Sequence, residues 1–281
     1  MVRKSEKMIE NKRVTGYTLK MIALITMLVD HVAAVLLWRM YVASYKITGS
    51  MQLSNQIGDK IIVWIADNQD IVYTVYELMR YIGRMAFPIY CFLLVEGFLH
   101  TSNVKKYALR LLAFAFISEI PFDLSITGKW WSYSYNNVFF TLLLGLIAIW
   151  ALSYIEKFYE FWQEKEWEPI LGCILVAIAG IIVVSITGGI AEMVLFTDYG
   201  FGGIIAIVIL YLFRRQRVMA FALCVLALSV VTDSTEILAM FMLYPIMRYE
   251  GTRGKQMKYL YYAFYPAHLL ILALICMAFG V

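Results

Sequence analysis

The chain has 281 residues, of which 62% are hydrophobic and only 16% are charged, and its mean hydropathy is +0.73. A soluble domain is about half apolar and about a quarter charged, so this composition excludes soluble globular, disordered, collagen-like and coiled-coil proteins. The net charge of +4 is spread between apolar runs instead of being gathered on one face or tail, which argues against nucleic acid as a partner. The sequence predicts an integral membrane protein.

Windows of about 20 mostly apolar residues mark helices that can cross the hydrocarbon layer. They predict spans near residues 17–38, 72–99, 107–127, 137–156, 169–187, 193–213, 217–232, 235–248 and 257–279. The seventh and eighth are short, and they are either two full spans or a re-entrant pair. Open strands cannot cross a bilayer, so we expect an all-α transmembrane bundle of about nine to ten membrane-embedded helices, in which the motif Asp198–Gly203 interrupts the sixth span.

The segments outside the spans predict the domain layout and the orientation. Residues 1–16 form a polar head, and residues 17–281 form one membrane domain with an outer loop near 39–70. Of the 24 Lys and Arg residues, 18 fall on the side of the N-terminus, four fall on the other side and two lie inside a span. By the positive-inside rule, the N-terminus is predicted to be cytoplasmic and the C-terminus to be outside. A bacterial-type cytoplasmic membrane is the expected location.

Ionisable residues at membrane depth are costly and usually face a bundle interior or a water-filled cavity. Depth can be counted from the cytoplasmic end of each span at about 1.5 Å per helical residue. Six residues from five spans then fall at roughly 15 to 22 Å, namely Asp30, His31, Arg84, Glu119, Asp198 and His268. This agreement predicts one buried polar layer.

The neighbours Asp30 and His31 diverge by about 100° on a helix, so they cannot pair face to face. We expect Asp30 to pair with Arg84 on another span, which leaves His31 free to point into a cavity. An imidazole in such a place can accept a proton near neutral pH. The alternative is a histidine that is hydrogen-bonded between helices and has no chemical role.

Basic residues gather at the predicted cytoplasmic face, around the turn that contains His100, Lys106 and Arg110 and at a corner that contains Arg214. Several cations at one membrane surface suit an anionic phosphate or nucleotide, although the positive-inside rule alone also accounts for them. The sequence contains no Walker A loop, no GxGxxG and no GxSxG motif. The cysteines lack metal-ligand spacing, so no metal site is expected.

Six blocks of sequence in chain order carry a family resemblance. They are Leu19–Ala23 with Met27–His31, Gly83–Pro88 with Glu96–Thr101, Tyr107–Pro121, Asn137–Thr141, Asp198–Gly200 and Tyr265–Leu269. The blocks resemble the TraX family, which is named for the protein that acetylates the N-terminus of F-type conjugative pilin. The family looks related to transmembrane acyltransferases that include the lysosomal heparan-glucosaminide acetyltransferase. In that class, acetyl-CoA enters from the cytoplasm and the acceptor is met inside or across the membrane.

The resemblance implies an acetyl-CoA-dependent transferase with acetyl-CoA as co-substrate. The acceptor is an amine or hydroxyl of a peptide or pilin N-terminus, an amino sugar or a cell-envelope glycan. We expect His31 to deprotonate the acceptor, Arg84 or His268 to stabilise the oxyanion, and Asp30 to hold Arg84 or to tune the electrostatics around His31. A covalent acetyl-histidine is the alternative to direct transfer.

The remaining expected contacts divide by ligand. The CoA contacts are Lys106, Arg110, His100 and Arg214, and the acceptor contacts are Glu119, Asp198 and Asn137. A transporter or flippase that uses the same buried charges is the alternative function, followed by a scaffold or assembly factor. The lipid bilayer is a further expected partner, and a homodimer is left open.

Overall fold

The computed structural model describes residues 14–47, 57–164, 169–255 and 257–281. Within these ranges the chain is all-α, with isolated bridges in place of strands. Five helices are long and apolar enough to cross a membrane: Gly16–Tyr45, Gln69–Leu99, Val138–Glu160, Leu171–Val194 and Leu260–Ala278. Three shorter apolar helices are Gly200–Leu212, Arg217–Val231 and Ser234–Met247. The predicted fold class is therefore confirmed, whereas the number of membrane-embedded helices stays a prediction.

The first helix runs without a gap through α2 (Gly16–His31), the π-helical segment η1 (Val32–Leu37) and α3 (Trp38–Ile47). Thr15 caps its start, because the threonine hydroxyl accepts a hydrogen bond from the Thr18 amide. The helix continues past the predicted end at residue 38, and α4 (Ile57–Asp67) follows it. The predicted outer loop is therefore largely helical where the structure describes it.

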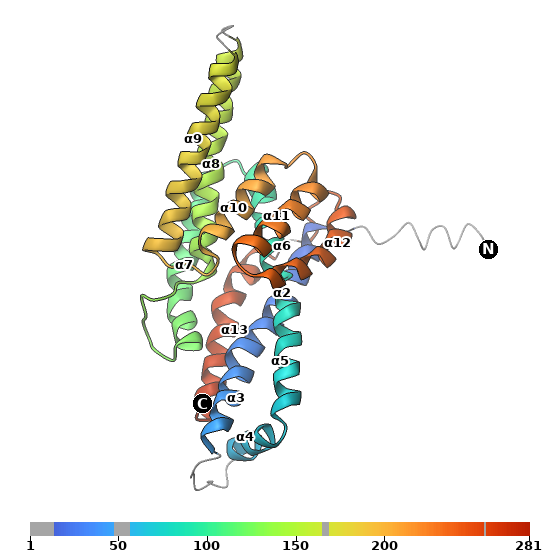
Figure 1. Cartoon of the computed structure of the whole chain (residues 1–281), viewed down its shortest axis with the longest axis vertical. Helices are drawn as coiled ribbons and strands as arrows, with labels where there is room; N and C mark the ends of the chain where they lie inside the picture. Colours follow the sequence, from blue (N-terminus) through green and yellow to red (C-terminus); the bar gives the residue numbers. More distant parts are fainter. Residues whose placement is uncertain (1–13, 48–56, 165–168, 256) are drawn as a thin grey trace, which may run out of the picture.

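The second predicted span is two helices, α5 (Gln69–Gly83) and α6 (Ala86–Leu99). Pro88 lies in the first turn of α6, where its missing amide hydrogen has no helical partner to lose. The helices α7 (Val104–Ile126) and α8 (Val138–Glu164) follow. The long α8 stands beside α9 (Pro169–Gly189), and the pair extends away from the rest of the bundle (Figure 1).

The predicted sixth span is divided where the glycine-rich motif begins. Its first residues belong to the π-helical segment η2 (Ile190–Val194), which ends the α9 helix, and a turn leads into α10 (Gly200–Leu212). Gly200 has φ +43°, a left-handed conformation that glycine adopts readily. Beyond it, α11 (Arg217–Val231), η3 (Ser234–Met242) and α12 (Leu243–Met247) form a short hairpin.

The last helix, α13 (Lys258–Ala278), runs parallel to the first helix. The Gly16 amide donates to the Thr252 carbonyl (2.8 Å), and Cys276 near the other end lies against Val35. Phe279, which follows α13, lies against Gly58 of α4. The start of α2 and the end of α13 therefore lie at opposite ends of this helix pair (Figure 1), while the membrane side that each end faces stays a prediction from the charge pattern.

Candidate active site

Two histidines from the parallel first and last helices meet in the middle of the bundle. His31 Nδ1 and His268 Nε2 are 2.7 Å apart, and the rings stack with centroids 4.9 Å apart. His31 is the last residue of α2, directly before the π-helical segment, and such segments are frequent at functional sites. Two of the six predicted residues of the polar layer are thus in direct contact.

The hydrogen bonds of His268 determine the tautomers of both rings. His268 Nδ1 lies 2.7 Å from the Phe264 carbonyl oxygen, which only accepts, so this nitrogen carries the proton. In the neutral pair, His268 Nε2 is then an acceptor and His31 Nδ1 is the donor. The lone pair of His31 is therefore on Nε2, which makes no hydrogen bond to any residue that the structure describes. This arrangement leaves His31 a base with a defined orientation.

Asp30 pairs with Arg80 and not with Arg84, so the predicted Asp30–Arg84 pair is wrong. Arg80 Nη1 lies 2.6 Å from Asp30 Oδ1. The reason is the close approach of α2 and α5 at Gly83, where a Cβ atom would overlap the Asp30 side chain. Asp30 thus lies over the last turn of α5, where Arg80 can reach it, whereas Arg84 follows the end of that helix.

Arg84 instead joins the second span to the turn of the α11–η3 hairpin. It donates to Glu236 (3.0 Å) and Asp233 (3.3 Å), and Glu236 is fully buried. Arg84 Nε is buried and has no hydrogen-bond partner among the described residues. Asp30 lies within electrostatic range of Arg84 as well as of Asp198. The guanidinium therefore occupies the predicted layer with a donor to spare.

Asp198 is held by the loop before α8. The Tyr135 hydroxyl donates to its carboxylate, and the next residue, Tyr199, stacks on Phe87 with ring centroids 3.5 Å apart. Asp198 lies within electrostatic range of both Arg80 and Arg84. The broken helix of the sixth span thus brings a carboxylate and a phenol to the arginines.

Glu119 and Asn137 are hydrogen-bonded to each other where α7 meets the start of α8. The Asn137 side-chain amide donates to Glu119 Oε2 and to the Ala115 carbonyl (2.8 Å). Glu119 and Asp123, one turn apart on α7, are both buried. Glu119 Oε1 and Asp123 Oδ1 have no hydrogen-bond partner in the described part of the chain. The three predicted acceptor residues are therefore in two sub-clusters, because Asp198 lies with the arginines.

The predicted CoA-binding residues divide into free and engaged groups. Asn103 caps α7 by accepting from the Lys106 amide, and the exposed Lys106 side chain makes no ion pair with a described residue. Arg110 lies over the Tyr107 ring and beside Tyr262, and its Nε is buried without a partner among the described residues. Tyr262 precedes His268 by six residues, or about 9 Å along α13. Arg110 therefore lies between the surface and the histidine pair.

His100 is at the end of α6, where its Nδ1 lies 2.8 Å from the Glu96 carbonyl. Glu96 accepts from Tyr249 (3.3 Å) and lies 3.4 Å from Arg217. Burial and, second, the Glu96 carboxylate raise the pKa of Tyr249 to about 12, so this hydroxyl stays protonated. These contacts tie α6, α11 and the loop before α13 together at one end of the bundle.

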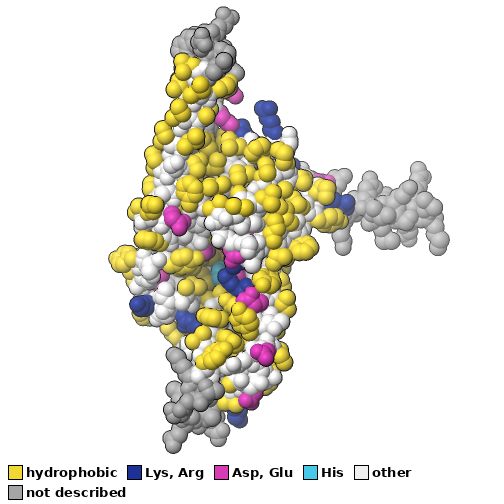
Figure 2. All heavy atoms as spheres, viewed as in Figure 1, with side chains coloured by type: hydrophobic (Ala, Val, Ile, Leu, Met, Phe, Trp, Pro, Cys, Tyr) yellow, Lys and Arg dark blue, Asp and Glu magenta, His cyan; other side chains and the backbone are white. Residues whose placement is uncertain are grey.

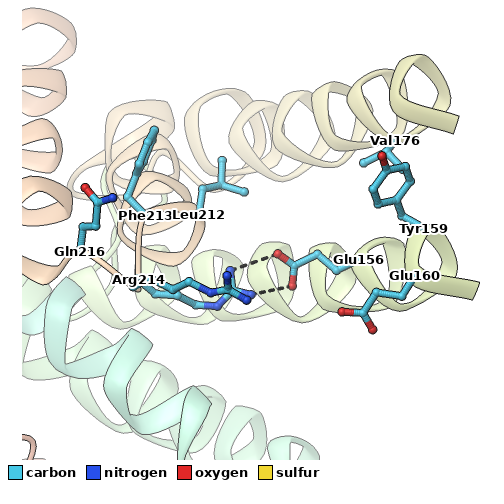
Figure 3. Close-up of a pocket in the computed structure, with 9 residues that line it drawn as sticks. Glu156, Tyr159, Glu160, Val176, Leu212, Phe213, Arg214 and Gln216 are labelled. Atoms are coloured by element: carbon cyan, nitrogen blue, oxygen red, sulfur yellow. Dashed lines mark hydrogen bonds and ion pairs between the residues drawn. The ribbon is translucent and has the colours of Figure 1, made fainter. Parts of the chain in front are cut away.

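Arg214 is already paired, which argues against a free cation there. Both of its terminal nitrogens lie 3.0 Å from the carboxylate oxygens of Glu156, and Tyr211 donates to the same carboxylate (2.6 Å). This ion pair lines a pocket of about 390 Å³ between α8, α9 and α10 (Figure 3), which also holds Glu160 and Arg215. The pocket is thus separate from the histidine pair.

The mid-depth charges are visible from outside the molecule. Figure 2 shows a histidine in a hollow at mid-height, among basic and acidic side chains and surrounded by hydrophobic surface. The Arg80, Asp30 and Arg84 side chains are 24%, 20% and 20% exposed, respectively. The described residues contain no cluster of three or more His, Cys, Asp or Glu side chains suited to a metal ion.

Comparison with known proteins assigns this arrangement to a family. The model of the TraX protein family matches residues 15–276, which include every residue of the polar layer. The chain belongs to the TraX family. It is also 27% identical over 228 residues to the probable fimbrial assembly protein FimC, serogroup H1, of Dichelobacter nodosus, covering 72% of this chain and 83% of that protein. No solved structure matches the chain. TraX membership links the chain to pilin and fimbrial assembly at the family level.

Sequence reasoning missed Arg80, Tyr135, Asp233 and Glu236 as members of the site. Arg80 carries a signal that could have identified it, because it is a second arginine inside a span and one turn before Arg84. Asp233 lies in the gap between two short predicted spans, and Glu236 is the second residue of the later one, so both carboxylates are indistinguishable from residues of a connecting loop. Tyr135 is in a loop, and only the fold brings it to Asp198.

Proposed function

We propose that this TraX protein transfers an acetyl group from acetyl-CoA to the N-terminal amine of a pilin or fimbrial subunit. The observation that carries the proposal is the unshared Nε2 lone pair of His31, oriented by His268 next to an arginine-rich layer at mid-depth. Family membership and the fimbrial relative support the class of acceptor. A hydroxyl acceptor, as on a cell-envelope glycan, would need the same base.

The proposed reaction is a direct transfer. The acceptor nitrogen attacks the thioester carbonyl, His31 Nε2 takes the proton from that nitrogen, and the new C–N bond forms as the C–S bond breaks. CoA leaves as the thiol after His31 returns the proton to sulfur. The negative charge on the carbonyl oxygen is stabilised by Arg84, whose Nε has no other described partner. His268 cannot supply this donor, because its one N–H is used by Phe264.

CoA is proposed to bind with its phosphates at Lys106 and Arg110. A buried guanidinium nitrogen without a partner is costly, so the Arg110 Nε favours a ligand that fills this place. The pantetheine arm would then follow α13 past Tyr262 toward the histidines. Arg214 is left out of this site, because Glu156 neutralises it.

The first test is the thermal unfolding of the detergent-purified protein with acetyl-CoA, CoA and ATP. We expect acetyl-CoA and CoA to raise Tm, ATP to have a smaller effect, and Arg110→Ala to abolish the shift. Arg248→Ala is the matched control, since this arginine is exposed and lies over Tyr244, and it should behave as wild type. A wild-type protein that responds to none of the three ligands would contradict the proposal and favour the transporter.

A further inference from the structure

The α11–η3 hairpin covers only half of the α5–α6 pair. The pair has 31 residues from Gln69 to Leu99, and Arg84 is at its middle. Asp233 lies in the turn of the hairpin, between α11 and η3, and its carboxylate is 3.3 Å from the Arg84 guanidinium. The hairpin therefore packs on α6 and on the adjoining end of α5, and it stops at the polar layer. Figure 1 shows α5 extending below the hairpin with no such cover.

The uncovered half of α5 presents an apolar stripe that leads to the site. Its large hydrophobic residues recur at helical spacing on one face, and all are exposed: Ile71, Val75, Leu78 and Ile82. The stripe ends beside Gly83 and Arg84. At this point the Asp233 side chain is 44% exposed, although charges at this depth are costly toward lipid. The apolar stripe thus ends at the partly exposed carboxylate of Asp233.

We propose that the acceptor reaches His31 sideways from the hydrocarbon layer, along the α5 stripe and under the tip of the α11–η3 hairpin. The proposed occupant is a membrane-embedded polypeptide segment, apolar along its body, whose terminal amine passes Asp233. This inference rests on the proposed acetyl transfer and specifies the route and form of its acceptor. A glycan chain fits the route poorly, because the stripe consists of aliphatic side chains and the exposed Thr74 hydroxyl beside it already donates to the Asp70 carbonyl.

The carboxylate at the end of the stripe matches the charge of such a segment. Asp233 uses one oxygen for Arg84 and the other for the Thr235 amide, and its exposed side can still attract a cationic amine. A protonated amine moving through hydrocarbon gains from this partner. It loses one proton to water before the neutral nitrogen reaches His31, which takes the second proton during the attack. Asp233 is therefore a positioning residue for the acceptor, while His31 remains the catalytic base.

The test blocks the stripe with a bulky label. In a Cys173→Ser background, whose other cysteines Cys91, Cys224 and Cys276 are buried, Leu78→Cys is labelled with pyrene maleimide. Ile178→Cys on α9, also exposed, is the matched control on a different lipid-facing helix. Each labelled protein is reconstituted in phosphatidylethanolamine vesicles with radiolabelled acetyl-CoA. The acceptors are an apolar peptide of about 20 residues with a free N-terminus, and water-soluble trialanine.

We expect the label at residue 78 to lower acetylation of the apolar peptide at least 10-fold while trialanine is acetylated at the control rate. Equal rates for both labelled proteins with the apolar peptide would overturn the lateral route, as would an equal loss for both acceptors. Acetylation of the phosphatidylethanolamine amine in preference to the peptide would overturn the polypeptide occupant. If wild type acetylates no acceptor, the proposed function itself fails, which is a distinct result.

Discussion

The histidine layer and the pocket at the end of α8 differ in how their polar atoms are satisfied. In the pocket, Arg214 and Glu156 bind each other through two hydrogen bonds of 3.0 Å (Figure 3). The Tyr211 hydroxyl donates a further hydrogen bond to the Glu156 carboxylate. In the layer, His31 Nε2 and Arg84 Nε lack partners among the described residues. The pocket has the volume, but the layer has the groups that can still react.

This contrast teaches that available hydrogen-bonding capacity identifies a site better than a hollow does. A buried polar atom without a partner costs free energy, so a protein that retains several of them at one depth gains something else from them. A satisfied ion pair, by comparison, holds α8 to the end of α10 and needs no ligand. Substitutions in the histidine layer and in the Arg214–Glu156 pocket should therefore have very different effects.

The largest effect is expected from His31→Ala, which removes the free lone pair. General-base catalysis contributes about 10²- to 10⁴-fold, so we expect acetyl transfer to fall by about 10³-fold. Stabilisation by CoA should persist, because Arg110 is untouched. Radiolabel transfer and the thermal shift measure the two separately, and turnover near the wild-type rate by the folded variant would rule out the role of His31.

A smaller loss is expected from His268→Ala, which leaves His31 without its orienting acceptor. Removing a partner that orients an imidazole costs about 10- to 100-fold, and we expect this loss in kcat with KM unchanged. His268→Gln places an amide oxygen where Nε2 was and should recover part of the rate. No difference between the two variants would mean that His268 only fills space.

The polar layer was largely predictable from the sequence, because membrane depth follows from residue counting. His31 and His268, both assigned to this layer, are in contact, although the sequence predicted a free His31 and no such pair, and Asp198 lies near the arginines. The partner of Asp30 was not predictable, since Arg80 and Arg84 differ by one turn and only the Gly83 contact decides between them. Counting also cannot foresee that a long helix continues through an expected loop, as α3 does.

The seam between α2 and α5 is expected to tolerate no added side chain. In Gly83→Ala the new methyl group would overlap the Asp30 side chain, so the helices must separate and weaken the Asp30–Arg80 pair. Overpacking of this kind costs about 1–3 kcal/mol, which a lower Tm in detergent would report. Gly189→Ala is the control, because a methyl group added there meets no atom within 4 Å. Equal Tm values for the two variants would contradict the close contact between Gly83 and Asp30.

The smallest effect is expected from Arg214→Ala, which removes only the Arg214–Glu156 ion pair of the pocket. The Arg214 and Glu156 side chains are partly exposed, and ion pairs of this kind contribute at most about 1 kcal/mol. CoA affinity should stay within about twofold of wild type, whereas Arg110→Ala loses it. A loss of CoA affinity in Arg214→Ala as large as that in Arg110→Ala would mean that CoA displaces Glu156 and that the pocket belongs to the site. The two variants therefore decide whether the satisfied ion pair is structural or is a closed form of the cofactor site.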